Sequence, residues 1–247
     1  MSDFKTNLLR FDRKNFITTH FIFPFLIFIS LITWIELNNI DLIFSQNFYD
    51  SQLKQWPYKE DWLISTIFHS YGGKFTKLLM AFMFIALLIT RVKTSFKSYT
   101  LPLAFLFITS VIGPCIVIFL KGKTHIYCPW DLTFFGGLQP YIHLFDPIHE
   151  SLKIGHCFPA AHASGGFTFM SFYFFFILIK PHYKYYGLAF GLLLGLIYGV
   201  SQQMRGAHFL SHDLFSAAIC WFMSVLLFFL LLNFTIHYNK ANYSKSS

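Results

Sequence analysis

Apolar residues in this sequence come in long blocks separated by short polar segments, without the two-residue alternation of a half-buried strand. A helix needs roughly 20 mostly apolar residues to cross a bilayer, and several blocks reach or approach that length. We therefore predict six membrane-spanning helices, at residues 16–35, 72–90, 101–120, 164–179, 186–200 and 214–232. The fourth and fifth blocks are short, so we expect their helices to extend into the polar motifs beside them.

Composition indicates that lipid is the main solvent of this protein. Of its 247 residues, 55% are hydrophobic and only 12% are charged, whereas a soluble domain carries about a quarter charged residues. Backbone groups in lipid must be satisfied internally, which predicts an all-α fold, a polytopic bundle of six transmembrane helices. No repeat or linker divides the chain, so residues 1–247 are expected to form one domain. We expect residues 62–71 to lie along the membrane interface as a short amphipathic helix.

The basic residues indicate how the bundle is oriented. The net charge is +8, but Lys and Arg lie between apolar blocks, where they set topology or contact lipid headgroups, so no nucleic-acid partner is expected. The short segments on one side carry Lys5, Arg10, Arg13, Lys14, Arg91, Lys93, Lys97, Lys180, Lys184, Lys240 and Lys245. The positive-inside rule makes this side cytoplasmic. We therefore expect a multi-pass protein of the cytoplasmic (inner) membrane with both termini in the cytoplasm.

Polar and ionisable residues gather on the opposite side, in segments 121–129, 159–166 and 201–213. Ionisable residues at the ends of spans are candidates for function, because they are costly to hold near lipid. Lys121, Lys123 and Arg205 offer positive charge and hydrogen-bond donors to a phosphate group. Backbone N–H groups around Ala161, where the fourth span begins, would also point at an anion.

Two histidines of these segments can do chemistry on a phosphate. His162 and His208 can exchange protons near neutral pH, or attack phosphorus when neutral. The sequence has no HExxH pattern and no cluster of carboxylates typical of a two-metal site. We therefore expect a periplasmic active site that uses neither a metal nor a cofactor.

The three segments resemble the motifs of the type 2 phosphatidic acid phosphatase (PAP2) superfamily, Lys-x6-Arg-Pro, Pro-Ser-Gly-His and Ser-Arg-x5-His-x3-Asp. Here they read Lys121-x6-Cys128-Pro129, Pro159-Ala160-Ala161-His162 and Ser201-Gln202-x5-His208-x3-His212. The resemblance covers most of the chain, because the family has six spans with these motifs on the second and third outer segments. The stretches CPWD and RGAHFLSHD are similar to the bacterial branch that includes lipid A phosphatases.

The resemblance implies roles for individual residues. His208 matches the nucleophile that becomes a phosphohistidine, His162 matches the general acid, and Lys121 matches a phosphate-binding lysine. The chain departs from the motifs at Cys128, Ala160 and Gln202, and we expect Arg205, one helical turn after Gln202, to supply the missing guanidinium. His212 stands where the family carries the carboxylate that orients the nucleophile, and Asp213 follows it. The two are alternatives for that role.

These residues together indicate an enzyme, a phosphoric monoester hydrolase that removes a phosphate from lipid A or a related phosphorylated lipid of the bilayer, as in lipopolysaccharide modification. Two alternatives stay open: a lipid phosphotransferase with a polyprenyl diphosphate donor, and a non-catalytic relative that binds lipid phosphate. The motif departures support the non-catalytic relative, and the retention of both histidines argues against it.

Two cysteines also fall in the outer segments. Cys128 and Cys157 lie on the side of the membrane where disulfides persist if it is a periplasm or the exterior. They either form a disulfide that ties the first motif to the second, or remain free thiols.

Overall fold

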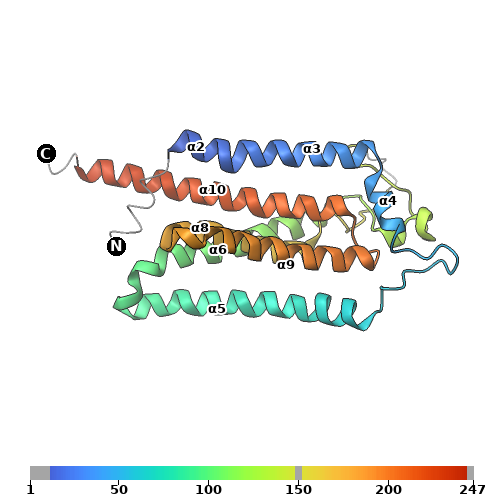
Figure 1. Cartoon of the computed structure of the whole chain (residues 1–247), viewed down its shortest axis with the longest axis horizontal. Helices are drawn as coiled ribbons and strands as arrows, with labels where there is room; N and C mark the ends of the chain where they lie inside the picture. The colour runs from blue at the N-terminus through green and yellow to red at the C-terminus, as the bar shows by residue number, and fades with distance from the viewer. Residues whose placement is uncertain (1–11, 148–151, 244–247) are drawn as a thin grey trace.

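The computed structural model describes residues 12–147 and 152–243. Six helices are long and apolar enough to cross a membrane, and they run alongside one another in a bundle (Figure 1). They are Arg13–Leu37, Trp62–Val92, Thr94–Lys121, Ala161–Ile179, Pro181–Met204 and Leu210–Phe234. The predicted all-α fold is confirmed, since the described residues form helices and no strand.

Most spans consist of helical segments that follow one another directly. In chain order the segments are α2 (Arg13–Ile17), η1 (Thr18–Ile22) and α3 (Phe23–Leu37); η2 (Trp62–Tyr71) and α5 (Gly72–Val92); η3 (Thr94–Tyr99) and α6 (Thr100–Lys121); α7 (Ala161–Phe167), η6 (Thr168–Ser171) and α8 (Phe172–Ile179); η7 (Pro181–Tyr183) and α9 (Lys184–Met204); and α10 (Leu210–Tyr243). The loops carry α4 (Ile40–Gln46), η4 (Pro129–Asp131) and η5 (Thr133–Phe135).

The fourth and fifth spans extend into the neighbouring motifs, as predicted. The fourth begins at Ala161 and includes His162, and the fifth ends at Met204 and includes Gln202. Between them, Lys180 leaves the helical conformation directly before Pro181, as expected for a residue that precedes proline. Both motifs therefore begin or end on rigid helices.

The prediction for residues 62–71 is wrong. These residues form η2, which continues into α5 through Gly72 in the right-handed helical conformation. Asp61 starts the helix, because its Oδ1 accepts a hydrogen bond from the backbone N–H of Ile64 at 3.0 Å. The second span is therefore longer than predicted, and its first turns pack against α9.

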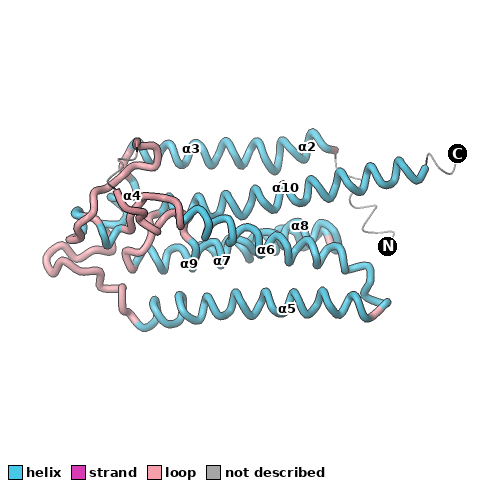
Figure 2. The backbone as a smooth tube through the Cα atoms, turned by 180° about the vertical axis from the view of Figure 1, so that it is seen from behind, coloured by secondary structure: helices cyan, strands magenta, loops and turns pink. Residues whose placement is uncertain are grey.

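The long loops and α4 gather at one end of the bundle, whereas short turns close the other end (Figure 2). The start of α2 and the far end of α10 both lie at the end with the short turns (Figure 1). That end also carries the turns after α5 and α8, with the basic residues Arg91, Lys93, Lys97 and Lys180. Lys5, Arg10 and Lys245 lie outside the described residues. The four basic residues of these turns therefore lie at the end opposite the polar motifs.

A row of glycines lets α9 approach the fourth span closely. Gly187, Gly191, Gly195 and Gly199 recur every four residues on α9, the spacing that places small residues on one helix face. A Cβ on Gly191 would lie 2.1 Å from the backbone nitrogen of Met170, and one on Gly195 would lie 2.1 Å from the ring of Phe167. This packing fixes the start of α7, and with it His162, against α9.

We expect Gly191→Ala to destabilise the protein by about 1–3 kcal/mol, because the added methyl meets backbone atoms that cannot move aside. The measurement is thermal unfolding in detergent. Gly73→Ala is the matched control, since a Cβ there meets nothing within 4 Å and should be neutral or slightly stabilising. Equal unfolding temperatures for the two variants would contradict the close packing.

Candidate active site

Residues from all three polar segments meet at the loop end of the bundle. Lys121 is the last residue of α6, His162 is the second residue of α7, and His208 lies in the turn between α9 and α10. Lys121, His162, His212 and His69 all lie close enough to His208 to interact with it electrostatically. The bundle therefore brings together groups that are far apart in the sequence.

His208 is buried, with 4% of its surface exposed. Its Nδ1 lies 3.6 Å from the sulfur of Cys157, which leaves Nε2 as the ring nitrogen for a substrate. Burial lowers the pKa of His208 well below its usual value of 6.5, and the charge of Lys121 lowers that pKa further. His208 is therefore neutral at neutral pH, which is the form that can attack phosphorus.

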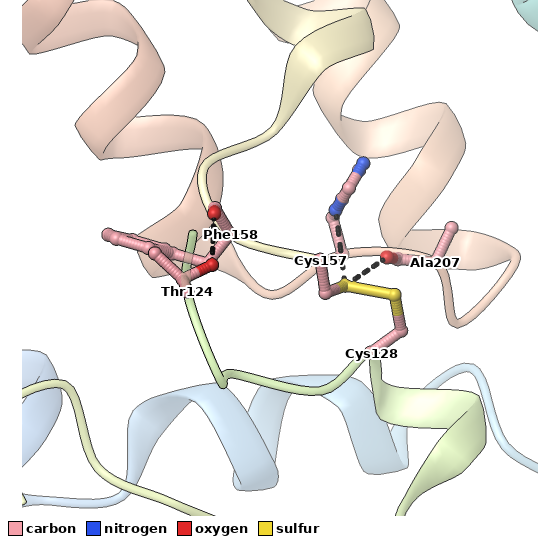
Figure 3. The surroundings of a disulfide bond; sticks show 6 residues. Thr124, Cys128, Cys157, Phe158 and Ala207 are labelled. Carbon is pink, nitrogen blue, oxygen red and sulfur yellow. Dashed lines mark hydrogen bonds between the residues drawn. A yellow bond between two sulfur atoms is a disulfide. The ribbon is translucent and has the colours of Figure 1, made fainter. Parts of the chain in front are cut away.

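Cys128 and Cys157 form a disulfide, which confirms the bridged alternative. Figure 3 shows the bond joining two loop segments that also pair through Thr124, whose Oγ1 donates a hydrogen bond to the carbonyl of Phe158 at 2.6 Å. The Cys157 sulfur lies 3.0 Å from the carbonyl oxygen of Ala207, the residue before His208. The disulfide thus fixes both loops against the turn that carries His208, and closing such a loop is worth about 3–4 kcal/mol in the chain-entropy model.

His162 is held by the second and fifth spans. Its Nε2 lies 3.0 Å from the carbonyl oxygen of Phe68, so this nitrogen carries the proton and donates it to the carbonyl. The ring stacks on Tyr198 at a centroid distance of 4.5 Å and meets His69 at 4.8 Å. Since Nε2 is engaged, Nδ1 of His162 is the nitrogen left to exchange a proton with a substrate.

Arg205 lies directly after α9 and leans back over Gln202. One guanidinium nitrogen, Nη1, donates to Gln202 Oε1 at 3.1 Å, and Nε donates to the carbonyl of Lys59 at 2.9 Å. The charge of Arg205 acts on both His69 and His162. The guanidinium therefore lies beside Gln202 and next to the histidine cluster, and its contact with a phosphate stays a prediction.

The other predicted phosphate-binding groups differ in their surroundings. Lys121 is partly buried beside His208, whereas Lys123 is exposed and its Nζ lies 5.9 Å from the ring centroid of Phe119, one turn back along the chain. Ala161 is the first residue of α7. In the first turn of this helix, the backbone N–H of Ser164 donates a hydrogen bond to the carbonyl of Ala160. A substrate contact of Lys123 or of the Ala161 amide stays a prediction.

His212 and Asp213 both lie in the first turn of α10 and are buried. The ring of His212 lies 5.8 Å from that of His208, and its Nδ1 has no hydrogen-bond partner among the described residues. Asp213 accepts a short hydrogen bond from Gln203 Nε2, so its carboxylate is directed towards α9. Neither side chain makes a hydrogen bond to His208 in the described part of the chain, and the orienting role stays a prediction for both.

Cys157, His208 and His212 hold potential metal-ligand atoms within 4.8 Å of one another. The sulfur of Cys157 is already bonded to Cys128, however, and cannot supply the thiolate that a metal would bind. With the disulfide intact, this set does not fit a resident metal ion.

A family model that describes the PAP2 superfamily matches residues 101–236, more than half of the chain. The chain belongs to the PAP2 superfamily. No curated protein and no solved structure matches it significantly. The match covers all three motif segments, so membership in the PAP2 superfamily and the positions of the motifs agree.

The structure gives two departures from the PAP2 motifs a physical context. Cys128, at the position of the first-motif Arg, is committed to the disulfide. Gln202 stands at the position of the third-motif Arg, and its side-chain oxygen accepts a hydrogen bond from the guanidinium of Arg205. No described contact replaces the hydroxyl missing at Ala160.

The sequence did not single out His69, which lies beside His162 because the second span begins at Trp62. His69 lies just before the apolar block at residues 72–90, and this position could have marked it as a candidate. It was missed because residues 62–71 were expected to lie along the membrane interface.

Asp41 was also missed, and it fixes the start of α10. Phe209, the residue before this helix, has no side-chain acceptor to cap it. The buried Asp41 of α4 supplies one: its Oδ1 accepts from the backbone N–H of Ser211 at 3.0 Å, and its Oδ2 accepts from the Ser211 hydroxyl. The first turn of α10, with His208 just before it and His212 within it, is thereby anchored to α4.

Asp41→Ala should destabilise the protein by about 1–3 kcal/mol, because the buried donors of Ser211 would lose their acceptor. Asp41→Asn keeps an acceptor oxygen but cannot ionise, and it isolates the pH effect. Burial raises the pKa of Asp41 to about 6 from its usual 3.8, so its contribution to stability is present in acid and is lost as the pH rises between these values. Thermal unfolding against pH should show the wild type losing stability relative to Asp41→Asn over this range, and parallel curves would contradict the assignment.

Proposed function

We propose that this PAP2 protein is a lipid phosphatase that forms a phosphohistidine at His208. The observation that carries the proposal is the convergence of Lys121 and three histidines, His69, His162 and His212, on a buried, neutral His208, with Arg205 beside His69 and His162. Such a cluster suits a phosphoryl group, whose oxygens need charge stabilisation while a nucleophile attacks phosphorus.

The reaction proceeds in two displacements. Nε2 of His208 attacks phosphorus, and the bond from phosphorus to the lipid oxygen breaks. His162 takes up a second proton, on Nδ1, when the anionic phosphate binds, and gives that proton to the departing oxygen. Water then attacks the phosphohistidine, His162 takes a proton from it, and inorganic phosphate leaves as His208 is regenerated.

The remaining groups bind or orient. Lys121 and Arg205 hold the phosphoryl oxygens, the Ala161 amide adds a donor at the start of α7, and Lys123 attracts the anionic headgroup. We propose His212 or Asp213 as the group that orients His208 when substrate is bound. The sulfur of Cys157 beside Nδ1 keeps the ring in place in the free protein.

We propose that the whole chain, residues 1–247, works as one domain of the cytoplasmic (inner) membrane, with both termini in the cytoplasm and the site on the periplasmic face. The supporting observation is that the basic turns after α5 and α8 lie at the end opposite the motifs. Lipid A or a related phosphorylated lipid is the proposed substrate, on the likeness of the CPWD and RGAHFLSHD stretches to lipid A phosphatases.

His208→Ala should lower phosphate release from lipid phosphates in detergent by at least about 10³-fold, since removing a nucleophile abolishes its pathway. His182→Ala is the matched control, because His182 is exposed and lies in η7 at the opposite end of the bundle. Turnover of the His208 variant at the wild-type rate would eliminate the scheme.

A further inference from the structure

Three residues of metal-binding types meet at the catalytic cluster: Cys157, His208 and His212. Their potential ligand atoms lie within 4.8 Å of one another, and all three side chains are buried. The sulfur of Cys157 is bonded to Cys128, so the set cannot bind a metal while that bond exists. Once the bond is broken, Cys157 carries a thiol, which becomes a metal ligand when it loses its proton. The chemistry of the set therefore depends on the disulfide.

The spacing of the three groups suits a thiophilic divalent ion such as Zn²⁺. Bond lengths of zinc to sulfur and nitrogen place the ligand atoms of a tetrahedral site about 3.4–3.6 Å apart. The sulfur of Cys157 already lies 3.6 Å from Nδ1 of His208. His212 completes the set, and its buried Nδ1 has no hydrogen-bond partner among the described residues. One thiolate and two imidazoles are ligands that zinc accepts, with a fourth position left to water.

Cys157 is held in place by contacts other than the disulfide. Thr124 Oγ1 donates to the carbonyl of Phe158, the residue after Cys157, at 2.6 Å (Figure 3). The backbone N–H of Gly155 donates to the carbonyl of Thr124 at 3.0 Å. These two hydrogen bonds fix the chain on both sides of Cys157. We therefore expect its sulfur to stay beside His208 when the disulfide is absent.

Only the thiol form supplies the negative charge that a cation needs at this place. The charge of Lys121 acts on His208 and would also repel a metal ion, and a disulfide has no charge to offset it. A thiol that binds a metal releases its proton and becomes a thiolate, which places one negative charge beside the ion. Metal binding therefore requires that the disulfide be absent.

We propose that these three residues bind one divalent ion of the Zn²⁺ class whenever Cys157 is not bonded to Cys128, and that this ion stops catalysis. A metal on Nδ1 of His208 takes the lone pair of that nitrogen and leaves the ring proton on Nε2. Nε2 then has no lone pair with which to attack phosphorus. The disulfide thus keeps metal away from the nucleophile. The metal site does not depend on the proposed function, whereas the loss of catalysis rests on it.

Two variants separate the thiol from the disulfide. Cys128→Ala lacks the bond and keeps the Cys157 thiol, whereas Cys128→Ala/Cys157→Ala lacks both, so the two variants have lost the same cross-link. The free cysteines Cys115 and Cys220 remain in each. Full-length protein in detergent is titrated with Cd²⁺ alone, whose bond to a thiolate gives an ultraviolet charge-transfer band. The single variant should show this band and bind Cd²⁺ at least about a hundredfold more tightly than the double variant, because soft thiolate ligands select such ions.

The third ligand is tested in the Cys128→Ala background. Adding His212→Ala should weaken Cd²⁺ binding by at least about tenfold, since even the loss of a group that only supports a ligand costs about that much. Adding His182→Ala instead is the matched control, because His182 lies at the opposite end of the bundle, and it should leave the affinity unchanged.

Reduced wild type provides a second measurement that does not depend on the folding of a variant. A phosphine reductant cleaves the disulfide without adding a competing thiol: the phosphine takes up the oxygen of one water, and the two sulfurs gain two electrons and two protons. After removal of the reductant, this protein should show the cadmium band. Zn²⁺ should lower its phosphate release by at least about tenfold, and a chelator should restore it. Oxidised wild type should show neither effect.

Absence of the band from reduced wild type would overturn the inference. An equal band in the double cysteine variant, or undiminished binding after His212→Ala, would also overturn it, because the ion would then be held elsewhere. Metal uptake with full phosphate release would overturn the loss of catalysis. Cd²⁺ binding is measured without substrate, so these results leave the proposed function standing. Oxidised wild type that releases no phosphate would instead refute the proposed function and leave the metal site standing.

Discussion

Uncompensated positive charge at the edge of the membrane is the constraint on which the site depends. Lys121 and Arg205 stand near a buried histidine, and in the described part of the chain neither forms an ion pair with a carboxylate. A further proton on His208 would add to this repulsion, so the ring stays neutral. An anion in the same place lowers the electrostatic free energy, and a phosphoryl group can also accept the available donors.

The fold holds these groups together by several independent devices around the turn that carries His208. The disulfide fixes the loops before α7 against that turn, and Asp41 anchors the first turn of α10 from outside the bundle. The glycine row on α9 brings the start of α7 close to the fifth span. Each device acts on a different neighbour of His208, which keeps its geometry fixed although the surrounding segments are loops.

The bundle and most of the site could be predicted from the sequence, because apolar blocks of membrane length and motif spacing are local signals. The six spans and the positions of Lys121, His162, Arg205 and His208 follow from them. His69 and Asp41 could not be found in this way. Each acts through a contact with a segment that is distant in the sequence. His69 reaches His162 because the second span begins at Trp62, and Asp41 reaches Ser211 because α4 packs on α10.

The central claim is that a phosphoryl group becomes bonded to His208 during turnover. Full-length protein mixed with a radiolabelled lipid phosphate, quenched in alkali where phosphohistidine persists, and mapped by peptide mass spectrometry tests it directly. The account predicts a transient phosphoryl group on His208. Phosphate release without a labelled histidine, or with the label on a different residue, would contradict it.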